Sequence, residues 1–317
     1  MTFTAIAALA AFLFTAVILR FLIPALTKFK FGQQVREDGP AHHLKKQGTP
    51  TMGGIAIVAG FFLAALFFAW ASPEVMAVLL VTAGFGLIGF LDDFLKIKKK
   101  RSLGLRAYQK IIGQLLISIA FVVFWRTLPS YSSEILVPFF LVTIDMGLFF
   151  PLLVCLVFLS SANGANLTDG LDGLASGVTV IIAMFFLAIA IWAFNSPIAP
   201  AIGAMIGALL GFLLYNSHPA KVYMGDTGSL ALGGFVAVVA LLLGLPLFLF
   251  LVAIIYVIES LSVIVQVGYF KITKGKRFFK MAPIHHSFEL SGWHETKIVA
   301  LFMIITAIAC LTAMIGF

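Results

Sequence analysis

Apolar residues occur in long blocks along the whole chain, separated by short polar segments. Ten blocks have about the 20 residues that carry an α-helix across a hydrocarbon layer. They fall at residues 3–27, 50–70, 75–95, 108–127, 147–163, 174–194, 198–215, 229–244, 246–270 and 297–316. The alternating pattern of an outer-membrane barrel is absent. The pattern predicts an all-α polytopic membrane protein with about ten transmembrane helices, and we expect residues 1–317 to form a single integral membrane domain.

Composition supports the same class of protein. Hydrophobic residues make up 62% of the chain and charged residues 11%, whereas about a quarter of a soluble protein is charged. Segment 128–146 is the longest on its side of the predicted membrane, and its Pro129, Ser130 and Pro138 indicate turns around a short hairpin.

The net charge of +8 could suggest a nucleic-acid partner, but the positions of the charges indicate otherwise. With ten spans, every Lys and Arg except Arg20 and Arg126 falls on one side of the membrane. The positive-inside rule makes that side the cytoplasm and places both termini outside the cell. Most of the basic residues therefore set topology, and we expect no nucleic-acid partner.

The histidines and most of the acidic residues share the predicted cytoplasmic side. All six histidines lie there, and of the acidic residues only Glu259 lies well within a predicted span. Carboxylates and imidazoles beside a basic rim are the side chains of a metal-and-phosphate site. We therefore expect an active-site cleft that opens to the cytoplasm.

Two acidic motifs lie at the ends of apolar blocks. Asp92 and Asp93 follow one block, and adjacent helical positions point about 100° apart, so both cannot face one ligand equally. Asp226 lies in GDTGS, where Thr227 or Ser229 can cap the next helix while backbone N–H groups face an anion. Taken singly, each motif also fits a solvated helix end or an ordinary turn.

The segment SANGANLTDGLDGLA, residues 161–175, places four polar side chains at three-residue intervals. They are Asn163, Asn166, Asp169 and Asp172. On a straight α-helix this spacing drifts by about 60° per step, and the glycines disfavour a straight helix. We predict a helix that unwinds as it leaves the membrane, so that all four side chains converge on a cavity.

The last cytoplasmic segment, 271–295, combines five basic residues with His285 and His286. On its own this segment reads equally well as a topology-setting loop with incidental histidines.

Five motifs, taken together and in order, resemble one family. They are GTPTMGG (48–54), LDDFLK (91–96), NGANLTDGLDG (163–173), GDTGS (225–229) and MAPIHHSFELSGW (281–293). The chain resembles the phospho-N-acetylmuramoyl-pentapeptide transferases, the MraY-type translocase I family, among the polyprenyl-phosphate hexosamine-1-phosphate transferases. The resemblance covers essentially the whole chain, and GTPTMGG and PIHH-FE are its most specific motifs.

The resemblance implies a ten-helix enzyme of the bacterial plasma membrane that acts in peptidoglycan synthesis. Such an enzyme transfers phospho-MurNAc-pentapeptide from UDP-MurNAc-pentapeptide to undecaprenyl phosphate, with Mg²⁺ as cofactor. The products are lipid I and UMP, and membrane lipid surrounds the enzyme. The resemblance leaves open whether the chain forms a homodimer.

The resemblance also implies roles for residues at matching positions. In the catalytic set, Asp92 is the base or nucleophile, Asp93 its neighbour, Asp226 the Mg²⁺ ligand, and His285 part of the histidine motif. The implied substrate-binding set is Lys46, Lys110, Asn163, Asn166, Asp169, Asp172, Asn216, Tyr223 and His286, with Tyr223 stacking on uracil. The chain departs from the family at Ser287, where a third histidine is usual.

The chemistry of the acceptor qualifies the role of Asp92. A phosphomonoester has a second pKa of about 6, so the acceptor is mostly a dianion at neutral pH and gains little from a general base. We therefore expect Asp92 to act through metal or phosphate positioning, or as a transient covalent acceptor.

Two other functions stay open. A related enzyme would transfer GlcNAc-1-phosphate from UDP-GlcNAc to the same lipid, although PIHH-FE argues against it. An ion-coupled transporter would also place carboxylates and broken helices in a membrane, but near its midplane, where this chain has only Glu259.

Overall fold

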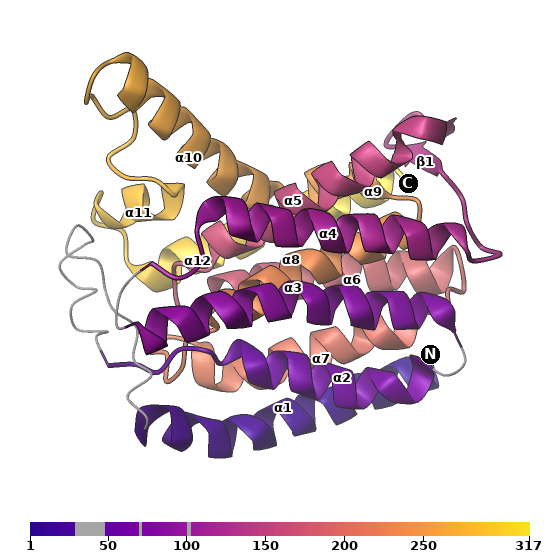
Figure 1. The fold of residues 1–317 in the computed structure, drawn as a ribbon, viewed down its shortest axis with the longest axis horizontal. Coiled ribbons are helices and arrows are strands. Elements are labelled where there is room, and N and C mark those ends of the chain that lie inside the picture. The colour runs from indigo at the N-terminus through magenta and orange to yellow at the C-terminus, as the bar shows by residue number, and fades with distance from the viewer. Residues whose placement is uncertain (29–47, 70–71, 100–102) are drawn as a thin grey trace.

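The computed structural model describes residues 1–28, 48–69, 72–99 and 103–317. It is a bundle of long helices with one short hairpin (Figure 1). In chain order the elements are α1 (Thr2–Lys28), α2 (Gly54–Ala69), α3 (Pro73–Lys98), α4 (Ala107–Arg126), β1 (Glu134–Val137), β2 (Val142–Asp145), η2 (Gly147–Phe149), α5 (Phe150–Thr168), α6 (Leu174–Trp192), α7 (Ala199–Asn216), α8 (Gly225–Leu242), α9 (Pro246–Val252), α10 (Ile254–Ile272), α11 (Ile284–Glu289) and α12 (Glu295–Ile315).

The long helices confirm the predicted all-α polytopic membrane protein. Among the residues described, nine helices are long and apolar enough to cross a membrane. The predicted span 50–70 corresponds to α2, an apolar helix of 16 residues, which is shorter than the roughly 20 residues of a full crossing. The chain is therefore a multi-pass membrane protein, with α2 as a shorter helix inside the bundle.

The predicted span 246–270 is wrong as a single helix. The structure divides it at Ala253 into α9 and α10. No proline or glycine marks the break. The first piece packs against α8, α12 and β1, and the second packs against α5, α12 and α11 and leans away from the bundle (Figure 1).

The central helix of the bundle is α8. It packs against α2, α3 and α5, and nearly all of its residues are buried. Its contact with α3 is unusually close at Gly89, where an added Cβ would lie 2.0 Å from the carbonyl oxygen of Asp226. Only glycine permits backbones to approach in this way. The contact places the last turns of α3 beside the first turn of α8.

The predicted hairpin is present. Strands β1 and β2 pair antiparallel, with Glu134 opposite Asp145 and Val137 opposite Val142. The hairpin and both chain ends lie at one end of the bundle, whereas α11 and the far end of α10 lie at the other (Figure 1).

The close contact at Gly89 predicts that a larger residue at this position destabilises the protein. We expect Gly89→Ala to lower the free energy of unfolding by about 1–3 kcal/mol, because the new methyl group meets backbone atoms that cannot rotate away. Thermal unfolding of the purified protein in detergent measures the change. The matched control is Gly268→Ala on α10, where a Cβ has no neighbouring atom within 4 Å. Equal melting temperatures for the two variants would contradict the close packing of α3 on α8.

Candidate active site

Three carboxylates from two helices form the centre of the site. Asp92 and Asp93 come from the last turns of α3, and Asp226 from the first turn of α8. One oxygen of each lies within 4.8 Å of the others. Their side chains are 1%, 3% and 15% exposed, respectively. Asp226 is therefore the carboxylate that a ligand can reach.

Asp93 binds the N-terminus of α8. Its carboxylate accepts hydrogen bonds from the backbone N–H of Asp226 at 3.2 Å and of Thr227 at 2.9 Å, and from the Thr227 hydroxyl at 2.7 Å. The first N–H groups of a helix lack internal partners and attract negative charge. The expected cap by Thr227 or Ser229 is wrong, because neither side chain caps the helix. The expectation that the N–H groups face an anion is confirmed, and the anion is the carboxylate of Asp93.

Asp92 faces different partners, as the angle between adjacent helical positions predicts. Its Oδ1 accepts a hydrogen bond from the backbone N–H of Leu105 at 2.7 Å and lies 3.1 Å from the Lys110 ammonium. Its Oδ2 lies 2.6 Å from Lys96 Nζ. Asp92 therefore connects α3 to the segment before α4.

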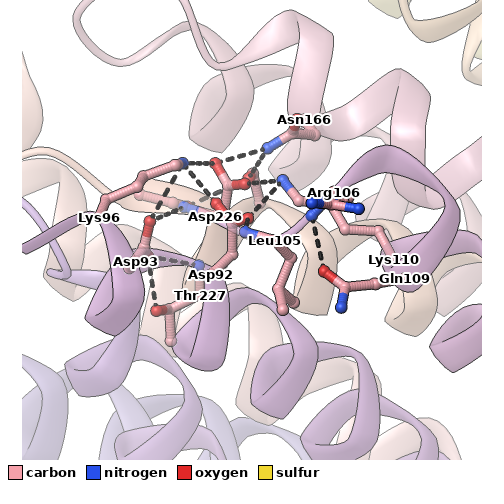
Figure 2. A network of polar contacts seen from close by, with 12 residues as sticks. Asp92, Asp93, Lys96, Leu105, Arg106, Gln109, Lys110, Asn166, Asp226 and Thr227 are labelled. Atoms are coloured by element: carbon pink, nitrogen blue, oxygen red, sulfur yellow. Dashed lines mark hydrogen bonds and ion pairs between the residues drawn. The ribbon is translucent and has the colours of Figure 1, made fainter. Parts of the chain in front are cut away.

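Two lysines compensate the three carboxylates. Lys96 Nζ lies 2.6 Å from Asp92, 3.2 Å from Asp226 and 3.6 Å from Asp93. Lys110 Nζ lies 2.5 Å from Asp226 Oδ2 (Figure 2). With all five groups ionised, one unit of negative charge stays uncompensated, which favours a further cation at this place.

Asn166 joins this network and Asn163 does not. Asn166 Nδ2 donates to Asp226 Oδ1 at 3.1 Å and to Ser229 Oγ at 2.8 Å (Figure 2). Asn163 Nδ2 instead donates to the Gln114 side chain at 3.0 Å. The predicted convergence of all four polar side chains is wrong. Because α5 stays helical through Thr168, Asn163 stays about 60° around the helix from Asn166 and bonds to Gln114 on α4.

The predicted unwinding occurs after Thr168, in the turn at residues 169–173. Asp169, at the start of this turn, is half-buried. Burial, together with the negative charges of Asp226, Asp93 and Asp172, raises the pKa of its carboxyl to about 8. Asp169 thus lies close enough to the carboxylate cluster for the charges there to affect its titration.

Asp172, at the other end of the turn, takes part in a second cluster. Its Oδ2 lies 3.0 Å from His218 Nδ1 and accepts a hydrogen bond from the backbone N–H of Ala220 at 3.0 Å. Its own N–H donates to Glu295 Oε1 at 2.6 Å. The turn is therefore anchored to the first residue of α12 and to the segment after α7.

Asn216 bonds to the same turn, and Tyr223 directly follows Val222, the other residue that Asn216 contacts. The Asn216 side chain accepts from the backbone N–H of Gly173 at 3.1 Å and donates to the carbonyl of Val222 at 2.9 Å. The half-buried Tyr223 donates its backbone N–H to the carbonyl of Pro50 at 2.8 Å. Asn216 is thus a bridge between loops, and Tyr223 pairs with the GTPTMGG segment.

Each histidine of the predicted motif has a carboxylate partner. His285 Nδ1 lies 3.0 Å from Glu259 Oε1, and both side chains are buried. His286 Nδ1 lies 2.7 Å from Glu289 Oε2, and the His286 side chain is 15% exposed. In this structure His286 is therefore accessible, and His285 lies behind the surface.

Ser287, where the family usually has a third histidine, holds its loop together. Its hydroxyl donates to the carbonyl of Met281 at 2.6 Å and accepts from the Met281 N–H at 3.0 Å. The side chain therefore closes the loop that precedes α11 and points at the backbone rather than at the carboxylate cluster.

Two family models match parts of the chain. A model described as "Glycosyl transferase family 4" matches residues 75–244. A second, described as "Phospho-N-acetylmuramoyl-pentapeptide-transferase signature 1", matches residues 46–58, and its first residue, the predicted substrate-binding Lys46, lies outside the described residues.

Curated relatives that carry the name phospho-N-acetylmuramoyl-pentapeptide-transferase match over most of the chain. The protein of Clostridium kluyveri is 51% identical over 296 residues, which cover 93% of each chain. That of Caldanaerobacter subterraneus is 52% identical over 92% of this chain and 91% of the relative. That of Clostridioides difficile is 50% identical over 95% and 94%. The chain belongs to the phospho-N-acetylmuramoyl-pentapeptide-transferase family.

The carboxylate cluster of this transferase fits a divalent cation. Carboxylate oxygens are the ligands that Mg²⁺ prefers, and it usually takes only one or two of them from the protein. Asp226 has the most exposed side chain of the three, and its oxygens contact the side chains of Lys96, Lys110 and Asn166, whereas backbone N–H groups bond to Asp93 and Asp92. Asp226 is therefore the residue best placed to hold such an ion.

Sequence reasoning missed several residues that shape the site. Lys96 is among the basic residues expected to set the membrane topology. Its spacing from Asp92 and Asp93, however, predicts ion pairs on one helical face. Glu259 stood out as an acid within a span, but nothing in the sequence pairs it with His285. No local signal indicates His218, because its partner Asp172 lies in a distant loop.

The raised pKa of Asp169 predicts a pH-dependent stability. The folded-state pKa of about 8 exceeds the ordinary value of 3.8, so the stability linked to its protonated form is full at low pH and is lost as pH rises toward 8. The melting temperature of the wild type, relative to Asp169→Asn, should fall between about pH 4 and 8 and level off above. The slope is at most about 1.4 kcal/mol per pH unit.

The asparagine variant is the control for all other titrating groups, since it mimics the protonated carboxyl at every pH. A constant difference in melting temperature across this range would show that Asp169 is already ionised at neutral pH.

Proposed function

We propose that the protein transfers phospho-MurNAc-pentapeptide from UDP-MurNAc-pentapeptide to undecaprenyl phosphate, giving lipid I and UMP. The observation that carries this proposal is the carboxylate and lysine cluster on α3, α4 and α8. It lies in a multi-pass membrane chain about half identical to relatives named for that activity. A membrane bundle suits a lipid acceptor, and a mixed-charge cluster suits a reaction between two phosphate groups.

The lysines carry the main electrostatic task of this reaction. The acceptor is already mostly a dianion at neutral pH, so the difficulty is to bring it against a charged pyrophosphate. Lys96 and Lys110 offer ammonium groups that Asp92 and Asp226 hold in place. With a side chain only 1% exposed, Asp92 is better suited to orient these lysines than to form a covalent intermediate.

Mg²⁺ is the proposed cofactor, with Asp226 as its ligand. When bound, the ion would neutralise charge on the pyrophosphate. Asp93 holds the helix end that carries Asp226, and Asn166 fixes the carboxylate from α5.

The nucleotide is proposed to bind beside the turn at residues 169–173. Tyr223 and His286 are partly exposed and offer an aromatic face and an imidazole. Asp172 and Asn216 hold the turn in shape. The remaining predicted side chain of this pocket, Lys46, is proposed to contact phosphate.

The proposed location is the bacterial plasma membrane, with the active site on the cytoplasmic face and both termini outside. The positive-inside distribution of Lys and Arg supports this orientation. The site lies on the polar turns at one end of the long helices, and both termini lie with the hairpin at the other (Figure 1).

The activity is tested with purified protein, UDP-MurNAc-pentapeptide, undecaprenyl phosphate and Mg²⁺. We expect UMP and lipid I in equal amounts, measured by chromatography and mass spectrometry. Reactions with UDP-GlcNAc as donor, and reactions without lipid, are the controls. Consumption of UDP-GlcNAc in place of the MurNAc donor would contradict the proposal and identify the GlcNAc-1-phosphate transferase.

The metal assignment predicts unequal effects of two acidic substitutions. Asp226→Asn should raise the Mg²⁺ concentration for half-maximal activity by about tenfold or more, because it removes the accessible ligand. Asp172→Asn should change it less, because Asp172 bonds to His218 and Ala220 instead. Binding of Mn²⁺ measured by electron paramagnetic resonance supplies a second readout. Equal shifts in both variants would argue against this division of roles.

A further inference from the structure

A buried pair of titratable side chains lies outside the carboxylate cluster. Glu259 and His285 both have no exposed surface, and Glu259 Oε1 accepts a hydrogen bond from His285 Nδ1 at 3.0 Å. Within the residues that the structure describes, Glu259 Oε2 and His285 Nε2 are buried without a hydrogen-bond partner. Such groups are costly in a folded protein and call for an explanation.

The second nitrogen of His285 points at the turn of the candidate site. An added Cβ at Gly170 would lie 2.1 Å from His285 Nε2 and 2.5 Å from its Cε1. The edge of the imidazole ring therefore lies directly against the backbone of Gly170. Asp169 directly precedes this glycine, and Asp172 lies two residues after it.

The pair connects three elements that are distant in the sequence. Glu259 lies on α10 just after the break at Ala253, His285 lies on α11, and Gly170 follows the end of α5. Both α5 and α11 pack against α10. A rigid ring held between α10 and the turn transmits the position of one element to the other.

Space filling alone does not account for this pair. A buried carboxylate and imidazole are usually no more stable than apolar side chains of similar size, and an ionisable residue within a membrane span is costly. What the pair offers is orientation, because a carboxylate on one ring nitrogen fixes both the tautomer and the direction of the other nitrogen.

We propose that Glu259 is a positioning residue that acts through His285. It holds the imidazole by Nδ1 so that the Nε2 edge supports Gly170 and sets the turn that carries Asp169 and Asp172. The link to catalysis rests on the proposed function, in which this turn borders the nucleotide. The effect of Glu259 on the turn itself does not depend on the proposed function.

Hydrogen exchange measured by mass spectrometry on the full-length protein tests the effect on the turn. In Glu259→Leu we expect the peptide covering residues 169–173 to exchange at least about threefold faster than in the wild type. Glu259→Gln should stay near the wild type, because the amide oxygen still accepts from Nδ1. The matched control is Ser262→Ala, since Ser262 is buried on the same helix and bonds only to the Glu259 carbonyl.

Unchanged exchange in Glu259→Leu, or Glu259→Gln behaving like Glu259→Leu, would overturn the proposal. Where Glu259→Leu fails to fold, Gly170→Ala perturbs the same contact from the other side, and faster exchange in the turn is again the expected result.

Equilibrium binding of UMP tests the link to the nucleotide. Gly170→Ala should weaken binding by about tenfold in the wild-type background, because its methyl group meets the ring. In the His285→Ala background the same change should cost no further affinity, because the ring is gone. Additive losses would overturn the proposal. A wild type that binds no UMP would count against the proposed function, whereas the exchange results would still decide the role of Glu259.

Discussion

The whole site depends on the hydrogen bonds between Asp93 and the N-terminus of α8. A carboxylate buried at this depth is stable because helix N–H groups and the Thr227 hydroxyl surround it. The contact requires α3 and α8 to approach as closely as Gly89 permits. Once the two helix ends are joined, Asp92 and Asp226 necessarily lie side by side. Two acids at a short distance must then be compensated by positive charge.

That requirement explains the lysines. Lys96 follows Asp92 by one helical turn, so the helix that supplies the carboxylates also supplies a counter-ion. Lys110 comes from the start of α4, which the bond from Leu105 to Asp92 draws toward the cluster. Ammonium groups that the carboxylates hold in the free protein are in place to contact phosphate oxygens when a substrate arrives. The charge balance of the free protein and the chemistry of phosphate transfer therefore demand the same residues.

The sequence was informative wherever one segment decides its own structure. Apolar blocks predict the long helices, because a membrane forces each span to satisfy its own hydrogen bonds, and turn residues predict the hairpin. Prediction failed where two distant segments decide together. The break at Ala253 has no local signal, the partner that caps α8 comes from α3, and Asn163 turns to Gln114 on α4 rather than to the acids. The motif resemblance predicted that the acidic residues share one site, but it did not predict which of their side chains are accessible.

The geometry also separates the two halves of the proposed site. The acidic cluster is held within the bundle by α3, α4, α5 and α8, whereas the turn at 169–173 is held by α11, α12 and the loop after α7. Asp169 belongs to both halves, because it starts the turn and because the charge of Asp226 raises the pKa of its carboxyl. A change in α10 or α11 should therefore reach the nucleotide side first and leave the metal side intact.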